Sequence, residues 1–201
     1  MTLGDSPRIK ICVSGAADTS HCGDKSFEVA YELGKEIARQ NCVLVEGATT
    51  GFPYFAARGA KEAGGVVVGI SPASTEREHV EHYGLPLEYR DLIIYTGFGY
   101  SGRNLILTRA SDAVINGCGR VGTINEFTIA FEDRKPIGIL EGPWDTDELI
   151  KEMINKSHRA HEMSDKIIYE SDPKIMVEKL IKLVEIEKKL DGAPSEVPPY
   201  D

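Results

Sequence analysis

The segment Ala113–Glu126, which reads A-V-I-N-G-C-G-R-V-G-T-I-N-E, decides the fold of this chain. Its first residues, Ala113–Ile115, form a short apolar run with the length and composition of a buried strand. The turn Gly117–Thr123 is rich in glycine, and a helical pattern begins behind it. A strand, a glycine turn and a helix in this order are typical of α/β folds, in which ligands bind where the strands end.

Six further apolar, β-branched-rich runs of strand length lie on both sides of this segment. They are Ile9–Val13, Cys42–Val45, Val66–Ile70, Leu92–Tyr95, Ile137–Leu140 and Ile167–Tyr169. Most of the intervals between them have a helical period instead, as where Val29, Leu33 and Ile37 recur at every fourth residue. This alternation predicts a doubly wound α/β fold, with a mostly parallel sheet of about seven strands flanked by helices on both faces.

Acidic residues mark three of the predicted helix starts. Asp24 can cap the helix that carries Val29, and Asp145 with Glu148 resembles a capping box. Asp172 stands directly before Pro173, which is the order expected of an N-cap and a first helical residue.

One interval and both ends of the chain depart from this pattern. Residues 71–91 are too polar and too rich in Pro, Gly and His for a crossover helix, so we expect a short helical turn over Glu76–His82 in a lid or an interface. We expect one domain over residues 8–190, with an N-terminal tail at 1–7. The C-terminal tail, 191–201, contains three prolines and is expected to be disordered or packed on a neighbouring subunit.

Composition excludes several classes of protein. The 201 residues include 32 acidic and 23 basic ones, and the formal charge of −9 argues against a general DNA or RNA binder. No apolar stretch approaches the ~20 residues of a membrane helix, so no membrane association is expected. The first residues lack the layout of a secretion signal, which makes the cytoplasm the expected compartment. Small-molecule ligands stay possible.

Cysteine and histidine spacing predicts no metal site. The four cysteines show neither CxxC spacing nor the density of a disulfide scaffold, so we expect reduced thiols at Cys12, Cys22, Cys42 and Cys118. The pairs His79/His82 and His158/His161 are spaced i, i+3 but lack a helical HExxH motif or a carboxylate as third ligand. We interpret all four as solvated surface histidines.

Four glycine-rich turns follow predicted strands: Ser14–Ala16, Gly47–Gly51, Gly97–Arg103 and Gly117–Thr123. Glycine lets a backbone approach an anion closely, and a helix that follows offers unpaired N–H groups and the positive end of its dipole. Right-handed crossovers bring these turns to one edge, and we expect the site at the switch between the first and fourth strands. The candidate phosphate- or nucleotide-binding residues are Ser14, Gly15, Gly47, Thr49, Gly102, Gly117, Gly119, Arg120, Gly122 and Thr123. The alternative interpretation is that these glycines bind no phosphate and only allow tight turns.

Gly117, Gly119 and Gly122 spell GxGxxG, and Glu141 ends the next strand, which formally matches a dinucleotide fingerprint. The motif follows the fifth strand rather than the first, and Glu126 in the first helical turn would repel a second phosphate. A mononucleotide therefore fits better than a nicotinamide cofactor, and no cofactor is expected.

Three segments resemble the LONELY GUY (LOG) proteins, a family also labelled lysine-decarboxylase-like. Gly119–Glu126, G-R-V-G-T-I-N-E, resembles the family's PGGxGTxxE motif, and Gly102-Arg103-Asn104 is similar to its arginine-containing turn. Leu44–Pro53 resembles its LVxGGGxxGLM segment, and the likeness covers roughly residues 8 to 140. Lysine decarboxylation itself would need a cofactor such as pyridoxal phosphate on a buried lysine, and no lysine in the sequence is marked for that role.

The resemblance implies a Rossmann-like nucleotide-binding domain, a homodimer or higher homo-oligomer, and hydrolysis of the N-glycosidic bond of nucleoside 5′-monophosphates. Arg103 and Glu126 would be its catalytic pair. Cys118 replaces the motif proline and Arg120 its second glycine, and molybdenum-cofactor carrier proteins are similar to this divergent branch. Two functions therefore stay open, a phosphoribohydrolase and a non-catalytic nucleotide or pterin carrier or sensor. Without the resemblance, Glu126 would simply be a favourable acid in a first helical turn, and Arg103 a surface ion-pair partner.

Overall fold

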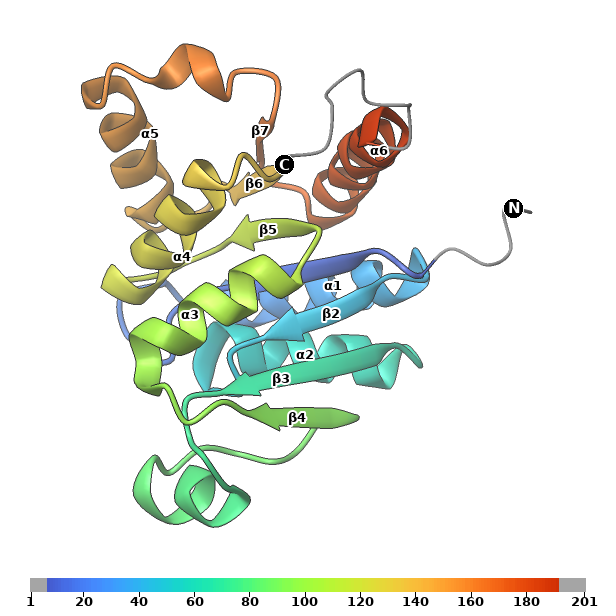
Figure 1. Ribbon diagram of the computed structural model, residues 1–201, viewed down its shortest axis with the longest axis vertical. Coiled ribbons are helices and arrows are strands. Elements are labelled where there is room, and N and C mark those ends of the chain that lie inside the picture. Colours follow the sequence, from blue (N-terminus) through green and yellow to red (C-terminus); the bar gives the residue numbers. More distant parts are fainter. Residues whose placement is uncertain (1–6, 192–201) are drawn as a thin grey trace, which may run out of the picture.

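Seven parallel strands form one sheet in the computed structural model, which describes residues 7–191 (Figure 1). The strands are β1 (Lys10–Ser14), β2 (Val43–Glu46), β3 (Val66–Ser71), β4 (Leu92–Tyr95), β5 (Ala113–Asn116), β6 (Ile137–Leu140) and β7 (Ile167–Glu170). The helices are α1 (Ser26–Arg39), α2 (Gly51–Glu62), α3 (Gly99–Ala110), α4 (Val121–Glu132), α5 (Thr146–Lys156) and α6 (Pro173–Asp191), with short turns η1 (Glu78–His82) and η2 (Ala160–Glu162). All seven predicted strands are confirmed, and each end lies within one residue of its expected position.

The strand order is β4-β3-β2-β1-β5-β6-β7, and every neighbouring pair is parallel. The winding direction therefore changes between β1 and β5. The predicted switch between the first and fourth strands is wrong, because β4 continues outward beyond β3 and becomes an edge strand. Its exposed side chains fit that place, since Leu92 and Ile94 are 54% and 44% exposed whereas all four residues of β5 are buried.

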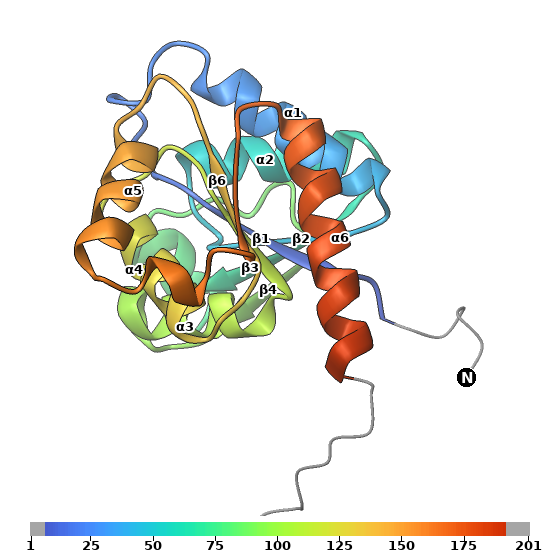
Figure 2. The same ribbon diagram turned by 90° about the horizontal axis from the view of Figure 1, so that it is seen from above.

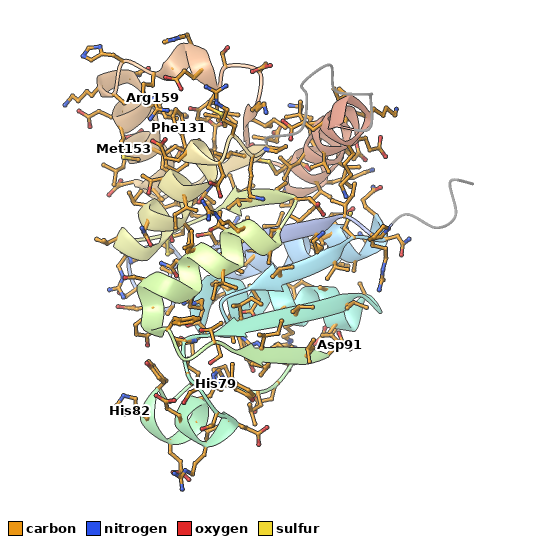
Figure 3. All side chains as sticks on the ribbon, viewed as in Figure 1. His79, His82, Asp91, Phe131, Met153 and Arg159 are labelled. Carbon is orange, nitrogen blue, oxygen red and sulfur yellow. A yellow bond between two sulfur atoms is a disulfide. The ribbon has the colours of Figure 1, made fainter. Side chains whose placement is uncertain are left out.

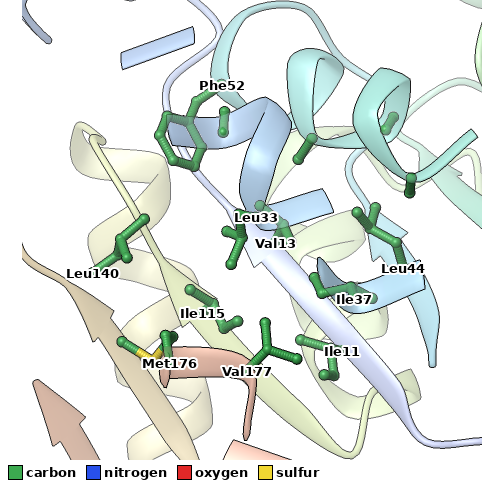
Figure 4. Close-up of a cluster of buried hydrophobic side chains, with 14 of the residues drawn as sticks. Ile11, Val13, Leu33, Ile37, Leu44, Phe52, Ile115, Leu140, Met176 and Val177 are labelled. Carbon is green, nitrogen blue, oxygen red and sulfur yellow. The ribbon is translucent and has the colours of Figure 1, made fainter. Parts of the chain in front are cut away.

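Helices cover both faces of the sheet, as the doubly wound fold requires (Figure 2). Alternate residues of one strand serve the two faces, so Ile11 and Val13 pack with α1, α2 and α6, while Cys12 packs with α3, α4 and α5. Figure 4 shows the first of these clusters, where Leu33 and Phe52 meet the strand residues. Helix starts α3 and α4 are thereby fixed at the carboxyl edge of the strands (Figure 1).

Of the three predicted helix caps, the structure confirms only the one at Asp172 with a side-chain hydrogen bond. Asp172 accepts hydrogen bonds from the amides of Lys174 and Ile175, at 2.8 and 3.0 Å, so this cap is confirmed. Asp145 is the N-cap residue of α5, but its side chain makes no capping hydrogen bond. The cap at Asp24 is wrong, because a turn with Gly23 in the left-handed region delays the first residue of α1 to Ser26.

The segment between β3 and β4 contains the expected helical turn over residues 76–82. His79 on this turn is fully buried, so its prediction as a surface histidine is wrong. Its Nδ1 lies 2.8 Å from the Ser71 Oγ and its Nε2 lies 3.1 Å from the Pro86 carbonyl oxygen, which satisfies both ring nitrogens. His82, beside it in Figure 3, is exposed as expected, and so are His158 and His161.

The helices within residues 7–191 are all too short or too polar to cross a membrane. The expected tails at 1–7 and 191–201 lie outside the described residues except at Pro7 and Asp191. Asp191 is the last residue of α6, so the helix extends one residue past the expected domain end.

Candidate functional site

A cleft of about 520 Å³ opens at the carboxyl edge of the sheet, beside the switch between β1 and β5. Its walls come from the turns after β1 and β2, the starts of α3 and α4, and residues 83–85. The predicted site residues that line it are Gly15, Gly47, Thr49, Arg103, Arg120, Gly122, Thr123 and Glu126. Ser14, Gly102, Gly117 and Gly119 are outside the lining. This is the edge at which parallel α/β sheets bind ligands.

Arg103 and Glu126 meet at this cleft from two different helices. The Arg103 Nη1 of α3 donates to the Glu126 Oε1 of α4 at 3.1 Å, and both side chains are only 8% exposed. The hydroxyl of Ser14, at the end of β1, donates to the other carboxylate oxygen, Oε2. Both oxygens of Glu126 are therefore held, and the carboxylate has a fixed orientation toward the cleft.

The environment of Glu126 favours the protonated form of its carboxyl group. Burial raises the pKa of its carboxyl group, while the charge of Arg103 and the Ser14 hydrogen bond act in the opposite direction. The nearby carboxylate of Glu46 adds to the rise. A buried carboxyl group with a raised pKa is a candidate for exchanging a proton with a bound molecule.

The first turn of α4 presents unpaired donors to the cleft. The first hydrogen bond at this end of the helix joins the Ile124 N–H to the Arg120 carbonyl, so the three amides of residues 121–123 have no acceptor within the helix. The Thr123 hydroxyl is buried and has no partner among the described residues. Amides and a hydroxyl at a helix N-terminus are typical of a phosphate site.

The other predicted glycines support the cleft from behind. The Gly119 amide donates to Thr146 Oγ1 and the Gly117 amide to the Ser14 carbonyl, so neither is free for a ligand. A side chain at Gly117 would meet the ring of Phe52, and one at Gly102 would meet Phe98. These positions need glycine for close packing of the turns.

Glu46 and Arg90 form a buried ion pair that the sequence did not reveal as part of the site. The Arg90 Nε and Nη2 lie 2.8 and 3.1 Å from the two carboxylate oxygens of Glu46, and neither side chain is exposed to solvent. Arg90 also donates to the carbonyl oxygen of Thr49, which lines the cleft, at 2.8 Å. The pair therefore fixes the end of the 72–91 segment to the turn after β2.

Two tyrosines that the sequence did not mark lie at the mouth of the cleft. The rings of Tyr83 and Tyr100 meet edge to face, with centroids 5.5 Å apart. The guanidinium carbon of Arg103 lies 5.9 Å from the centre of the Tyr100 ring. Their signal in the sequence was weak, because Tyr83 lies in an irregular segment and its contact with Tyr100 depends on the fold.

The expectation of four reduced thiols is wrong at two positions, because Cys22 and Cys118 form a disulfide across 96 residues of sequence. Adjacent strands β1 and β5 bring the loops that carry them together, and the Ala16 amide donates to the Cys118 carbonyl at 2.7 Å. Cys12 and Cys42 are free thiols as expected. Burial raises the pKa of both, that of Cys42 to about 11, so they stay protonated at neutral pH.

Residues 8–177 match the model of the SLOG cluster4 family. An uncharacterized protein of Archaeoglobus fulgidus is 33% identical over 135 residues, which span 67% of this chain and 83% of that protein. The molybdenum cofactor binding protein of Rippkaea orientalis is 27% identical, with a TM-score of 0.65 over 90% of this chain and 97% of that one. The Moco carrier protein of Chlamydomonas reinhardtii is 24% identical and has the same fold, with a TM-score of 0.71 over 90% and 99% of the chains.

Replacement of Gly47 by alanine should displace Arg103. The new Cβ would lie 2.2 Å from the Arg103 Nη1, whereas a Cβ at Gly122 meets nothing within 4 Å. We expect Gly47→Ala to lower the free energy of unfolding by about 1–3 kcal/mol, as overpacking does. The matched variant Gly122→Ala should stay within about 0.5 kcal/mol of the wild type. Urea unfolding measures both, and equal stabilities of the two variants would contradict the close contact.

The raised pKa of Glu126 predicts a pH-dependent stability. An unfolded glutamate ionises near pH ~4.3, and the folded Glu126 at higher pH, so between these values the folded state binds more protons. The stabilisation that this group contributes is complete below the unfolded pKa and is lost as the pH rises through the folded pKa.

The free energy of unfolding of the wild type minus that of Glu126→Gln should therefore decrease as the pH rises from about 4, just below the ionisation of an unfolded glutamate, toward about 8. Urea unfolding across this range measures the difference. The exposed Glu28→Gln serves as control and should show no such trend. A difference for Glu126→Gln that stays constant or rises with pH would contradict the raised pKa.

Proposed function

Because the chain belongs to the SLOG cluster4 family, we propose that its cleft binds a small molecule with a phosphate monoester and a planar heteroaromatic ring. A nucleoside 5′-monophosphate and a pterin phosphate share this chemistry. The family match confirms the resemblance to LOG proteins, on a divergent branch near the molybdenum-cofactor carriers. The named function of the Rippkaea orientalis protein supports the pterin alternative.

The observation that carries this proposal is the set of unpaired donors at one end of the cleft. The first-turn amides of α4, the Thr123 hydroxyl and the Arg103 Nε are without acceptors among the described residues. The Thr123 hydroxyl and the Arg103 Nε are buried, and an orphaned buried donor destabilises a fold by about 1–3 kcal/mol, so these two groups call for an acceptor. A phosphate offers three acceptor oxygens and the charge that the helix terminus favours.

The aromatic ring of the ligand would bind beside Tyr83 and Tyr100 at the mouth of the cleft. Tyr83 and Tyr100 offer ring surface there, and Leu85 and Pro53 add apolar contacts. Glu126 lines the same cleft, where its carboxylate can face a sugar. The lining therefore combines donors for a phosphate, a carboxylate and aromatic ring surface.

A second candidate, supported by the contact of Arg103 with Glu126, is hydrolysis of the N-glycosidic bond. The C1′–N bond breaks with its electron pair on the base, and a water oxygen bonds to C1′. Glu126 takes the proton of that water and stabilises the positive charge of the oxocarbenium-like transition state. Arg103 orients the carboxylate, and the proton leaves with the base, giving ribose 5-phosphate.

Binding is tested by isothermal titration with AMP, GMP, their nucleosides and a molybdopterin preparation. We expect a phosphorylated probe to bind at least about tenfold more tightly than its dephosphorylated form, because hydrogen bonds to charged groups contribute about 1.5–3 kcal/mol each. Thr123→Val should weaken this binding, while Thr128→Val, on the same helix but bonded only to Asn125, should not. Equal affinity for nucleosides and their monophosphates would overturn the phosphate site.

Turnover separates the two candidates. The hydrolase predicts ribose 5-phosphate from a bound monophosphate, detected by mass spectrometry, and its loss in Glu126→Gln with binding retained. Removal of a group that acts in acid–base catalysis lowers the rate by about 10²–10⁴-fold. Tight binding without any free base from the wild type would exclude the hydrolase and favour a carrier.

We also propose the homodimer and the cytoplasmic location that the sequence predicts. The acidic charge of the chain supports small ligands rather than nucleic acid as partners.

A further inference from the structure

His21, Cys22 and Cys118 form a compact cluster beside the cleft that the proposed function does not use. The His21 Nε2 lies 3.6 Å from the Cys118 Sγ and 3.8 Å from the Cys22 Sγ. All three potential ligand atoms lie within 4.8 Å of one another. The cluster joins two loops, because His21 and Cys22 lie in the loop after β1 and Cys118 lies in the turn after β5.

These distances match the edges of a tetrahedral metal site. With metal–sulfur bonds of about 2.3 Å and metal–nitrogen bonds of about 2.05 Å, tetrahedral angles separate nitrogen from sulfur by about 3.6 Å. Both nitrogen–sulfur distances in the cluster are already close to this value. The two sulfur atoms must move apart to about 3.8 Å, and they can do so once the bond between them is reduced.

We propose that the dithiol form of this chain binds one thiophilic d¹⁰ cation, of which Zn²⁺ is the probe, through His21 Nε2, Cys22 Sγ and Cys118 Sγ. A dithiol reductant gives two electrons and two protons to the Cys22–Cys118 bond and becomes a disulfide itself. The cation then replaces the two thiol protons, which leaves the site neutral. In the disulfide form the sulfur atoms carry no charge, and the cation does not bind.

The surroundings of the cluster fit such a cation. Cys22 and Cys118 are fully buried, while His21 is exposed and can be reached from solvent. The Gly119 carbonyl oxygen lies 3.3 Å from the His21 Nε2, so the imidazole has an acceptor when no cation is bound. Three protein ligands leave a fourth position for water, as in zinc sites that are not purely structural.

Metal titration of the full chain tests the proposal. The protein is stripped of metal, and one sample is reduced with a phosphine while the other keeps its disulfide. Zn²⁺ is added in competition with a chromophoric chelator, and Co²⁺ in parallel, whose thiolate charge-transfer absorption reports sulfur ligation. We expect one Zn²⁺ per reduced chain, the Co²⁺ absorption, and neither in the disulfide form.

Variants assign the ligands. His21→Ala alters an exposed residue, and it should weaken Zn²⁺ binding by at least about tenfold, because even outer partners of metal ligands contribute 10–100-fold. The exposed His82→Ala is its matched control and should bind like the wild type. The Cys22→Ser/Cys118→Ser double variant should lose the Co²⁺ absorption, and Cys42→Ser should keep it.

Three results would overturn the proposal. The first is a reduced chain that binds no stoichiometric Zn²⁺. The second is equal binding by the reduced and disulfide forms, and the third is unchanged affinity in His21→Ala. Since His21→Ala removes an exposed side chain, it tests the site even if the double cysteine variant fails to fold.

Discussion

The carboxylate of Glu126 is the group on which the carboxyl edge of this sheet depends. It joins β1 through Ser14 and α3 through Arg103, while its own helix, α4, packs on the sheet face behind it. Removing one partner of such a buried pair leaves an uncompensated charge and destabilises a protein by about 3–5 kcal/mol. The same carboxylate lines the cleft. A substitution of Glu126 therefore affects both the packing of this edge and the proposed chemistry.

The fold could be predicted from local patterns because the central strands β1, β2, β5 and β6 are buried along most of their length. The run Ile137–Leu140 has no polar side chain, and the first polar residue after it, Glu141, marks its end. The order of the strands in the sheet could not be predicted in this way. Leu92–Tyr95 and Ala113–Asn116 are similar as sequences, and only the path of the intervening chain makes one an edge and the other a centre.

Some residues of the site could also be predicted from the sequence, and others could not. Thr123 and Glu126 belong to one LOG-like motif and Arg103 to a second, so the resemblance to that family is what groups these three residues. Glu46 pairs with an arginine 44 residues away, and Cys22 with a cysteine 96 residues away. The first pair meets because residues 72–91 return beside β3, the neighbour of β2, and the second because β1 and β5 are neighbours. His79 shows a further limit, since an i, i+3 spacing does not tell a buried ring from an exposed one.

The pair of Glu46 and Arg90 has a consequence for the chain beside the cleft. Salt screens ion pairs that water surrounds, but it screens buried ones little, and this pair has no exposed surface. Arg90 also holds the carbonyl oxygens of Pro86 and Glu88, so the chain beside the cleft is anchored at several points. Residues 83–90 beside the cleft therefore keep their position at high ionic strength as well as at low ionic strength.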